Sequence, residues 1–348
     1  MRIVVDMVAA QAGTGGPYTH AREFMSAWAA EFPDDEIILV GPEWVDEMRP
    51  DAGRWRFVRH RGASTLTRLL GHQVRVPWAA LTSRADATLT TLPMIGYAKT
   101  VKRRYCFAHD WRHLQKPSEF SRAQRLYRRR WLSSVKAADV AFCISRKTLD
   151  ETRALVPGAH LALAENGCDH ATRWPQTRDL APDRVRDVLL AFGHRNNKRP
   201  DLAIGALPTV TADLDLVVVG AAGEQRTRLE ALAREEGVAD RCRFPGFVSD
   251  DQVHALYARA AAVLLLSSDE GFGLPAGEAL ALGIPVVGTT DGGLADVFGN
   301  RVGLAEPDAD AVARAIDAAL AARPEPAADL PTWAAAVRTV RDEIGRHA

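Results

Sequence analysis

The chain has 348 residues, of which 47% are hydrophobic and 25% charged, a composition typical of a folded globular protein and not of a disordered or fibrous one. At about 100–200 residues per domain, this length predicts two domains. Basic and acidic residues number 44 each, and a net charge of zero gives no indication of nucleic-acid binding. The charge is divided unevenly, because residues 1–170 carry 25 basic and 18 acidic side chains, a net +7, and residues 171–348 carry a net −7.

Cysteine spacing and apolar run lengths favour a protein of the reducing cytoplasm. The four cysteines lie far apart and form no Cys-x-x-Cys pair, which disfavours a disulfide framework and a structural zinc site. The apolar start Ile3–Val5 is interrupted by Asp6 and followed by a polar loop, unlike a signal peptide. The longest apolar run, Ala260–Leu266, has seven residues, whereas a bilayer span needs about 20. We therefore expect a cytoplasmic protein, with at most a peripheral contact at the inner face of the membrane.

In the N-terminal half, short apolar runs alternate with amphipathic stretches. This alternation predicts a parallel sheet with helices on both faces. The expected strands are Ile3–Asp6, Glu36–Val40, Ala87–Thr91, Tyr105–Ala108, Val140–Ile144 and Leu161–Ala164. The expected helices are Pro17–Phe32, Leu66–Ser83, Ser118–Ala138 and Arg146–Val156.

After a linker, the same alternation returns. Ala171–Arg186 is rich in Pro, Arg, Thr and Asp without apolar periodicity, and is interpreted as that linker. The strands expected beyond it are Val188–Phe192, Leu214–Val219, Cys242–Phe244, Ala262–Leu266 and Pro285–Val287. The expected helices are Asp201–Leu207, Glu224–Glu236, Asp250–Arg259, Pro275–Leu282, Asp308–Ala322 and, after a hinge at 325–330, Pro331–Ala348. Each half predicts a Rossmann-like unit, with the ligand at the carboxyl ends of the strands between the halves.

The strongest functional signal lies between Ser267 and Val287. An apolar strand ends there, a Gly271-Phe272-Gly273 turn follows, and Pro275 stands near the start of a helix. Free N–H groups near Gly273 and Leu274 would form an anion site at the helix N-terminus. Glu270 and Glu278, with seven residues between them, flank that site and suit hydroxyl groups better than charge. A nucleotide sugar offers both, a diphosphate for the amides and hydroxyls for the carboxylates.

This string resembles the nucleotide-sugar glycosyltransferases of family 4, whose retaining members carry two glutamates at this spacing in this context. The resemblance covers nearly the whole chain and is stronger in the C-terminal half. It implies the GT-B fold, an α/β architecture with two Rossmann-like domains facing a central cleft. Residues 1–170 would bind the acceptor, residues 171–330 the nucleotide sugar, and the helix 331–348 would pack back on the N-terminal domain.

The resemblance extends to the loop after the strand Val188–Phe192. In the family, this loop supplies an arginine and a lysine to the donor diphosphate, and here it runs from Gly193 to Lys198. Lys198 matches the lysine. The place of the arginine is taken by Arg195 or by His194, because the loop is short. A solvated basic loop is the alternative interpretation.

Two further segments match the family at strand ends. Phe244–Val248 corresponds to the stretch that holds the base mostly through backbone groups, and Pro245 removes one N–H donor from it. His109 and Asp110 follow the strand Tyr105–Ala108, where the family places a pair that faces the donor sugar. The alternative is a hydrogen-bonded histidine at a strand end, with Asp110 as a helix cap or a partner of the imidazole.

The loop Gly13–Gly16 between the first strand and the first helix looks like the family's glycine loop, which lies near the donor phosphate and the acceptor. Glycine permits close approach of the backbone to a ligand. The loop lacks the third glycine of the dinucleotide fingerprint, and no acidic ribose partner ends the next strand, so a nicotinamide-dependent dehydrogenase is disfavoured.

From these segments we predict the site residues. The predicted catalytic residues are His109, Arg195, Lys198 and Glu270. The predicted substrate-binding residues are Gly15, Gly16, Asp110, Gly193, Phe247, Val248, Gly271, Phe272, Gly273, Leu274 and Glu278. No Asp-x-Asp pair ends a strand on a plausible donor loop, so we expect no metal and no cofactor, with a GDP- or UDP-hexose type of nucleotide sugar as the donor substrate.

A basic stretch, Ser121–Lys136, contributes much of the positive charge of the N-terminal half. Arg122, Arg125 and Arg129 share one face at helical spacing. Such a face suits an anionic acceptor or an anionic membrane surface. The alternative is a solvated face whose arginine stems cover the core.

The residues and the resemblance together favour a retaining hexosyltransferase that acts by front-face displacement on a glycan, a lipid-linked acceptor or a natural product. The alternatives are a GT-B isomerase of the sugar-nucleotide 2-epimerase kind and a binding module without turnover. The isomerase would need acid and base residues at the sugar carbon, and the binding module would have no reason to keep Lys198, Glu270 and Glu278.

Overall fold

The computed structural model of the chain describes residues 1–10, 15–49, 53–62, 64–96, 98, 101, 103–177, 186–322 and 325–346. The chain forms two compact units: unit 1 comprises Met1–Gly167 and Pro331–Ala348, and unit 2 comprises Cys168–Leu330. The division falls close to the predicted domain boundary after residue 170. Of the predicted linker, residues 178–185 lie outside the described part, and Asp169–Arg173 form a short 3-10 helix, η4.

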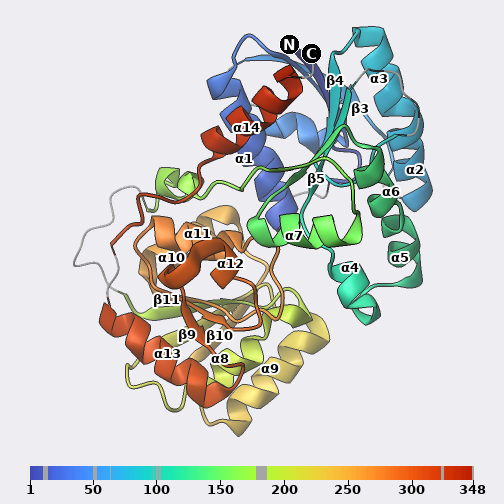
Figure 1. Cartoon of the computed structure of the whole chain (residues 1–348). Helices are drawn as coiled ribbons and strands as arrows, with labels where there is room; N and C mark the ends of the chain where they lie inside the picture. Colours follow the sequence, from blue (N-terminus) through green and yellow to red (C-terminus); the bar gives the residue numbers. More distant parts are fainter. Residues whose placement is uncertain are drawn as a thin grey trace. The chain divides into compact units, whose positions relative to one another are not determined.

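Unit 1 is built on a seven-stranded sheet in the order β3-β2-β1-β4-β5-β6-β7, with every neighbouring pair parallel (Figure 1). The sequence order reverses between β1 and β4, which is where a doubly wound sheet binds its ligand. The strands are β1 (Arg2–Asp6), β2 (Glu36–Gly41), β3 (Arg54–Arg59), β4 (Ala87–Thr90), β5 (Arg103–Ala108), β6 (Val140–Cys143) and β7 (Leu161–Leu163).

Two of the predicted helices of unit 1 are irregular, and two short helical segments, η1 (Glu43–Met48) and α4 (Arg112–Gln115), were not predicted. The predicted helix Leu66–Ser83 is divided by a π-helical turn, η2 (Gly71–Arg75), and the predicted helix Ser118–Ala138 by a break at Arg129. The remaining helical segments are α1 (Gly16–Glu31), α2 (Thr65–Leu70), α3 (Val76–Ser83), η3 (Pro117–Glu119), α5 (Arg122–Arg128), α6 (Arg130–Ala137), α7 (Arg146–Leu155) and α14 (Trp333–Arg346).

The edge strand β3 was not predicted. Its sequence Arg-Trp-Arg-Phe-Val-Arg does alternate polar and apolar residues over its first four positions, and the structure leaves its three arginines exposed beside β2. Charged side chains on an edge strand oppose pairing with a second sheet.

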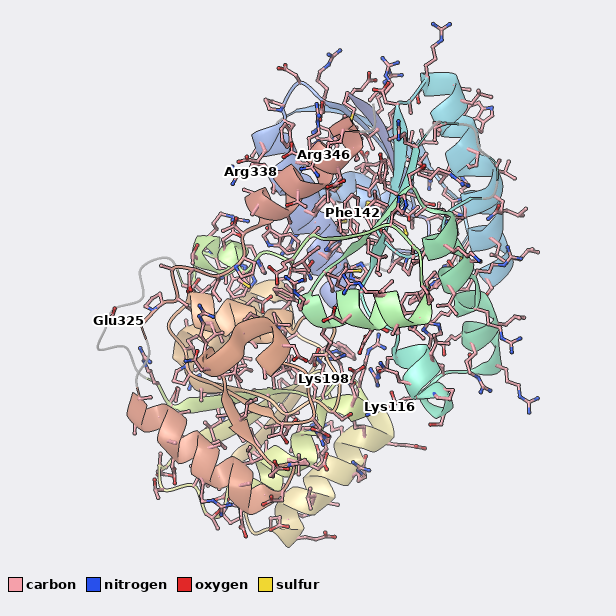
Figure 2. All side chains as sticks on the ribbon, viewed as in Figure 1. Lys116, Phe142, Lys198, Glu325, Arg338 and Arg346 are labelled. Atoms are coloured by element: carbon pink, nitrogen blue, oxygen red, sulfur yellow. The ribbon has the colours of Figure 1, made fainter. Side chains whose placement is uncertain are left out.

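The C-terminal helix α14 packs against α1, although more than 300 residues of sequence separate them (Figure 1). Asp35 joins the two ends of the chain, because it accepts hydrogen bonds from the N-terminal ammonium at 2.7 Å and from Arg341 Nε at 2.8 Å. Trp333 fills the space beside Gly167, where even a Cβ atom would lie 2.2 Å from its backbone nitrogen. In Figure 2, Phe142 lies inside unit 1, whereas Arg338 and Arg346 of α14 point outwards.

Unit 2 has a six-stranded parallel sheet in the order β10-β9-β8-β11-β12-β13. The strands are β8 (Val188–Phe192), β9 (Asp215–Val219), β10 (Cys242–Gly246), β11 (Ala260–Leu265), β12 (Val286–Thr289) and β13 (Gly303–Ala305). The helices are η5 (Asn196–Lys198), α8 (Pro200–Ala206), α9 (Gly223–Glu235), α10 (Asp250–Arg259), α11 (Leu274–Ala281), α12 (Ala295–Phe298), η6 (Gly299–Arg301) and α13 (Ala309–Ala322). Aliphatic side chains of β8, β9 and β11 form its core with α8 and α13. The short elements β13 and α12 were not predicted.

Candidate functional site

Lys198 lies where the chain leaves the central strand β8 of unit 2. Gly193 is the next residue after this strand and packs tightly against β9. A Cβ atom at this position would lie 2.8 Å from the Val218 side chain. The chain then forms the single turn η5, and Arg199 adopts a left-handed conformation with φ 44° before Pro200 opens α8. This sharp turn holds Lys198 at the carboxyl end of β8 with 9% of its surface exposed.

Lys198 forms an ion pair with Glu270, from the loop after β11. Its Nζ lies 2.6 Å from Glu270 Oε1. The two loops are joined a second time, because Asn197 Nδ2 donates to the Asp269 carbonyl at 3.1 Å and the Ser268 N–H donates to the Asn197 carbonyl at 2.9 Å. The structure thus brings together two of the predicted catalytic residues, which stand 72 positions apart in sequence.

Arg195, the third predicted catalytic residue of unit 2, is exposed on the same loop, and its carbonyl accepts the Lys198 N–H at 3.1 Å. His194 is half-buried beside Gly220. Both side chains stand at the carboxyl end of β8, so the choice between them for the arginine position stays open.

Arg199 was not among the predicted site residues, yet it joins three loops. Its guanidinium donates to the Leu266 carbonyl at 2.8 Å, to Thr289 Oγ1 at 2.7 Å and to Asp291 Oδ1 at 2.5 Å. Burial alone would raise the pKa of Asp291, but the bonds from Arg199 and Thr289 lower it below its ordinary value. Arg199 is therefore a structural cation, and the sequence signal was only its place beside Lys198.

The helix α11 begins at the predicted anion site. Gly273 is its N-cap with φ 86°, and a Cβ atom there would lie 2.4 Å from Leu294. The first N–H groups of a helix have no acceptor within the helix, and the macrodipole makes this end positive. Phe272 and Leu274 are 2% and 6% exposed, with Phe272 packed edge-on against Phe298. These two predicted residues can therefore offer a ligand their backbone only, as can Gly271, which has no side chain.

Glu278 is buried inside α11 with both carboxylate oxygens in hydrogen bonds. Oε1 lies 3.1 Å from His170 Nε2, and Oε2 accepts from the Tyr257 hydroxyl at 2.6 Å. Burial raises the pKa of Glu278, but these bonds outweigh it and the pKa lies below the ordinary value. Burial and the nearby carboxylate raise the pKa of Tyr257. Neither His170 nor Tyr257 was predicted, because no local pattern links either residue to Glu278.

The predicted base-binding segment lies at the end of β10. Phe247 is 63% exposed and Val248 is half-buried. Gly246 has φ 75°, and its carbonyl accepts the Gly220 N–H at 2.7 Å, which fixes the segment beside the end of β9. An exposed aromatic ring on a fixed loop can stack on a planar base.

In unit 1, His109 ends β5 as a buried and neutral imidazole. Its Nε2 lies 2.7 Å from the Thr91 carbonyl oxygen. Because a carbonyl oxygen can only accept a hydrogen bond, Nε2 carries the proton, and Nδ1 of the neutral ring has a lone pair that can accept one. Burial lowers the pKa of His109 despite this bond. Asp110 accepts the Arg112 N–H at 3.1 Å and lies 3.9 Å from Arg128, so its carboxylate fixes the turn that leads into α4.

A second histidine, His20, lies beside His109 and was not among the predicted site residues. The His20 ring of α1 stands edge-on at 4.7 Å from the His109 ring, and its Nδ1 lies 2.7 Å from Asn166 Oδ1. Burial, followed by the proximity of His109, lowers the pKa of His20 well below its ordinary value. Of the glycine loop, Gly15 is the N-cap of α1 with φ 85° and Gly16 is its first residue, while Gly13 and Thr14 lie outside the described residues.

Within the described ranges, no group of three or more His, Cys, Asp or Glu side chains is placed to hold a metal ion. None of the helices in that part of the chain combines the length and apolar character that a membrane crossing requires.

Comparison with known proteins shows which protein family unit 2 resembles. The family described as glycosyl transferases group 1 matches residues 176–330, which contain the Lys198–Glu270 pair and Glu278. Unit 2 carries a glycosyltransferase domain. A similar curated protein is the D-inositol 3-phosphate glycosyltransferase of Salinispora tropica, 34% identical over 43% of this chain and 35% of its own length. The chain spans less than half the length of the curated relatives it matches.

Solved structures show that the glycosyltransferase domain belongs to a GT-B fold. Sucrose-phosphate synthase from Thermosynechococcus elongatus aligns with a TM-score of 0.68 over 99% of this chain and 94% of its own, at 20% identity. The Anabaena protein HepE, in complex with UDP-glucose, aligns with a TM-score of 0.64 over 99% of this chain and 95% of its own, at 15% identity. The predicted fold class is confirmed: the parallel sheets of both units match those of GT-B glycosyltransferases.

Proposed function

We propose that this glycosyltransferase domain makes the chain a retaining hexosyltransferase that uses a nucleoside-diphosphate sugar. The observation that carries the proposal is the Lys198–Glu270 pair, because it places a cation and a hydroxyl acceptor 2.6 Å apart beside the N-terminus of a helix in this domain. The UDP-glucose complex of HepE supports a nucleotide-sugar donor, since that protein shares the fold. The acceptor is a glycan, a lipid-linked sugar or a natural product.

The donor diphosphate would be held by Lys198, Arg195 and the backbone amides near Gly273 and Leu274. On its arrival the phosphate oxygens compete with Glu270 for the Lys198 ammonium, and Glu270 becomes available to sugar hydroxyls. Phe247 and Val248 would hold the base. Glu278 would reach the ribose only with the second lone pair of each oxygen, since the first pairs are used by His170 and Tyr257.

In the front-face displacement, the acceptor oxygen attacks the anomeric carbon on the face that the leaving group occupies. The bond from that carbon to the diphosphate oxygen breaks, the diphosphate keeps the electron pair, and its oxygen takes the acceptor proton. Negative charge therefore grows on the diphosphate, where Lys198 and the helix N-terminus stabilise it. A neutral His109, with Nδ1 unprotonated, can accept a hydrogen bond from a sugar hydroxyl but cannot supply positive charge.

The test is a panel of UDP-, GDP-, ADP- and dTDP-hexoses incubated with acceptors of the three classes, with products identified by mass spectrometry. We expect one donor to be consumed, with a product that keeps the anomeric configuration of the donor in its NMR spectrum. An inverted product would contradict the retaining mechanism. Conversion of a sugar nucleotide to an isomer in the absence of acceptor would replace the transferase by an epimerase.

A further inference from the structure

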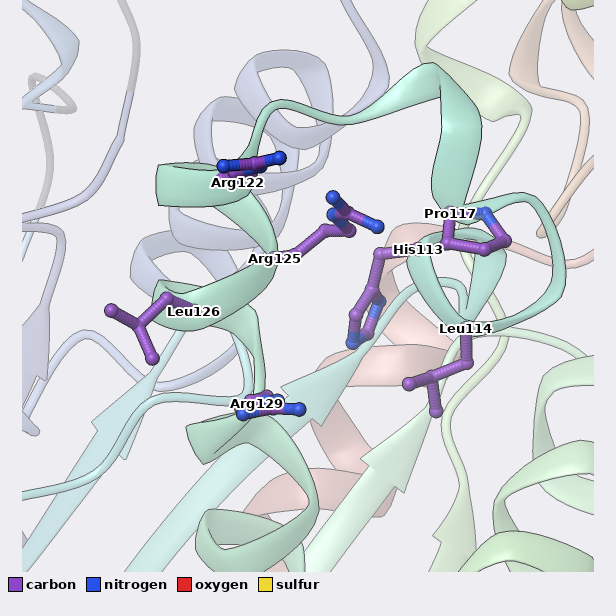
Figure 3. Close-up of a pocket in the computed structure, with 7 residues that line it drawn as sticks. All are labelled: His113, Leu114, Pro117, Arg122, Arg125, Leu126 and Arg129. Atoms are coloured by element: carbon purple, nitrogen blue, oxygen red, sulfur yellow. The ribbon is translucent and has the colours of Figure 1, made fainter.

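Unit 1 contains a pocket of 520 Å³ formed by α4 and η3 on one side and α5 on the other. Three arginines line the α5 side, namely Arg122, Arg125 and Arg129. His113 and Pro117 line the opposite side, and Figure 3 shows Arg125 reaching from α5 across the pocket towards them.

The three arginines carry uncompensated charge. Their side chains are exposed, and in the described part of the chain their guanidinium groups form no hydrogen bond or ion pair. The neighbouring arginines differ, because Arg112 pairs with Glu119, and Arg128 lies near Asp110 and stacks on Trp131 at 4.5 Å. Three like charges in one pocket repel one another, and an anion bound between them would relieve that repulsion.

His113 adds a buried polar group to the same pocket. It is 3% exposed and interacts with the Arg128 backbone through a long hydrogen bond. Burial, followed by the charge of Arg128, lowers the pKa of His113 to about 4, so the imidazole is neutral near pH 7. A neutral imidazole offers one N–H donor and one acceptor nitrogen to its surroundings.

The arginines stand on a helix that is fixed at its end and on its inner face. Ser121 and Gln124 form a capping box at the start of α5. The Tyr127 hydroxyl lies 3.0 Å from His72 Nε2, and His72 Nδ1 lies 2.6 Å from the buried carboxylate of Asp6 at the end of β1. The helix is thereby tied to β1, an interior strand of the sheet, and the pocket is preorganised for a ligand.

We propose that this pocket binds a phosphate ester and that the ester is part of the acceptor. The second half of the proposal rests on the proposed transferase function. Several donors converging on one small pocket suit a phosphate, which carries a charge of about −1.5 to −2 at pH 7 and accepts bidentate bonds from arginine. Exposed Leu114 and Leu126 beside the arginines suit the carbon portion of the molecule that bears the phosphate. The ester comes from a soluble phosphorylated acceptor or from a phospholipid headgroup.

The test measures binding of glycerol 3-phosphate by calorimetry and of phosphatidylglycerol vesicles by flotation, with phosphatidylcholine vesicles as the uncharged reference. A pocket variant carries Arg122→Gln, Arg125→Gln and Arg129→Gln. A control variant removes three exposed cations of unit 1 outside the pocket, Arg54→Gln, Lys136→Gln and Arg153→Gln. Both are checked by thermal melting, and Lys198→Ala tests whether the probe enters the donor loop instead.

We expect the pocket variant to lose at least about tenfold in affinity, since charge-assisted bonds to phosphate are removed, while the control variant and Lys198→Ala keep wild-type affinity. A loss seen with glycerol 3-phosphate assigns a soluble ester, and one seen only with anionic vesicles assigns a lipid headgroup. Equal losses in the pocket and control variants, absence of binding by the wild type, or loss only in Lys198→Ala would overturn the proposal.

Sugar-nucleotide binding, measured in parallel on the same variants, separates this proposal from the proposed function. If the wild type binds the phosphate probe through the pocket but binds no sugar nucleotide, the transferase function fails and the pocket stands. If it binds and transfers sugar while the pocket variant binds every probe normally, the pocket proposal fails alone.

Discussion

The polar groups that face each other at the carboxyl ends of the two sheets differ in charge. In unit 2, the loops after β8, β11 and β12 are joined by charged pairs, Lys198 with Glu270 and Arg199 with Asp291. In unit 1, two neutral, buried imidazoles, His20 and His109, lie beside the end of β5, in contact with each other and with uncharged acceptors, and the carboxylate at the end of β1, Asp6, is bonded to His72. Charge on unit 1 is instead concentrated on α5, where three arginines have no acidic partner in the described residues.

Because of this difference, a bound anion must compete with a protein carboxylate for its cation in unit 2, whereas on α5 of unit 1 it need not. An anion that reaches Lys198 displaces Glu270, so its binding is offset by breaking an existing pair, and the freed carboxylate gains a function only if the ligand also carries hydroxyls. The arginines of α5 have no such internal competitor. The two regions therefore suit a ligand with phosphate and hydroxyls in unit 2 and a simple phosphate ester in unit 1.

The largest effect is expected from removing the Lys198 cation. Lys198→Ala should lower kcat by about 10²-fold or more, because one electrostatic stabiliser of the leaving group is lost. Lys198→Arg should recover little, since a planar fork does not replace a compact ammonium in this turn. Steady-state kinetics measure both variants, with Arg228→Ala, an exposed cation of α9, as the control. Near-normal turnover of Lys198→Ala would remove the diphosphate from this loop.

Glu270→Gln should mostly lower kcat, by about tenfold or more, because its contact with the sugar tightens as positive charge spreads over the ring. The ion pair adds a sharper expectation: the double variant with Lys198→Ala should lose less than the product of the two single losses, since each partner positions the other. Glu235→Gln, exposed at the end of α9, is the control. Independent, multiplicative losses would show that the two residues act on turnover without coupling to each other.

Glu278→Gln should act on donor binding and on stability, and little on kcat. A glutamine cannot accept from both His170 and Tyr257 in the geometry of the carboxylate, and one unsatisfied buried group costs about 1–3 kcal/mol. We expect a lower melting temperature and a raised KM for the donor. The control is Tyr257→Phe, which removes one of the two bonds without touching the carboxylate. A variant with wild-type melting and a lowered kcat would assign Glu278 to the transition state instead.

Lowering the pH should destabilise the fold of each unit through the protonation of one carboxylate, Glu278 in unit 2 and Asp35 in unit 1. The pKa of Glu278 is lowered by His170 and Tyr257 against the effect of burial, and that of Asp35 by Arg341 and the N-terminal ammonium against the same effect. A depressed pKa in the folded state gives stability that is present above the ordinary carboxyl pKa and is lost as the pH falls through the folded value. The free energy of unfolding, measured from neutral pH down to below the ordinary carboxyl pKa, should depend less steeply on pH in Glu278→Gln than in the wild type. An unchanged slope would contradict the lowered pKa of Glu278.

The smallest effect is expected from a chelator. We propose that the donor charge is met by Lys198, Arg195 and the α11 N-terminus, so EDTA should change kcat by less than about tenfold, which corresponds to 1.4 kcal/mol. Addition of Mg²⁺ or Mn²⁺ to the treated enzyme should restore nothing. A larger loss that either ion reverses would place a metal at the diphosphate.

Local sequence patterns carried the prediction of most elements and of the donor loops. The buried strands read as apolar runs of four to six residues, and the Gly-x-Gly turn before Pro275 marked the start of α11 because both glycine and proline have strong backbone preferences. The same reasoning missed the π-helical turn η2 and the irregular turn at Arg129, since the backbone stays in the right-handed helical region there and only the hydrogen-bond pattern changes.

The sequence by itself thus determined the two α/β halves, the strand ends that carry Lys198, Glu270 and His109, and the spacing of the two glutamates. Only the tertiary structure decided how those side chains are used. Lys198 meets Glu270, Glu278 meets His170, and His109 meets His20, across 72, 108 and 89 positions of sequence respectively. Burial and partner together set whether each group is charged, and neither can be deduced from neighbouring residues, because both depend on chain segments that folding alone brings into contact.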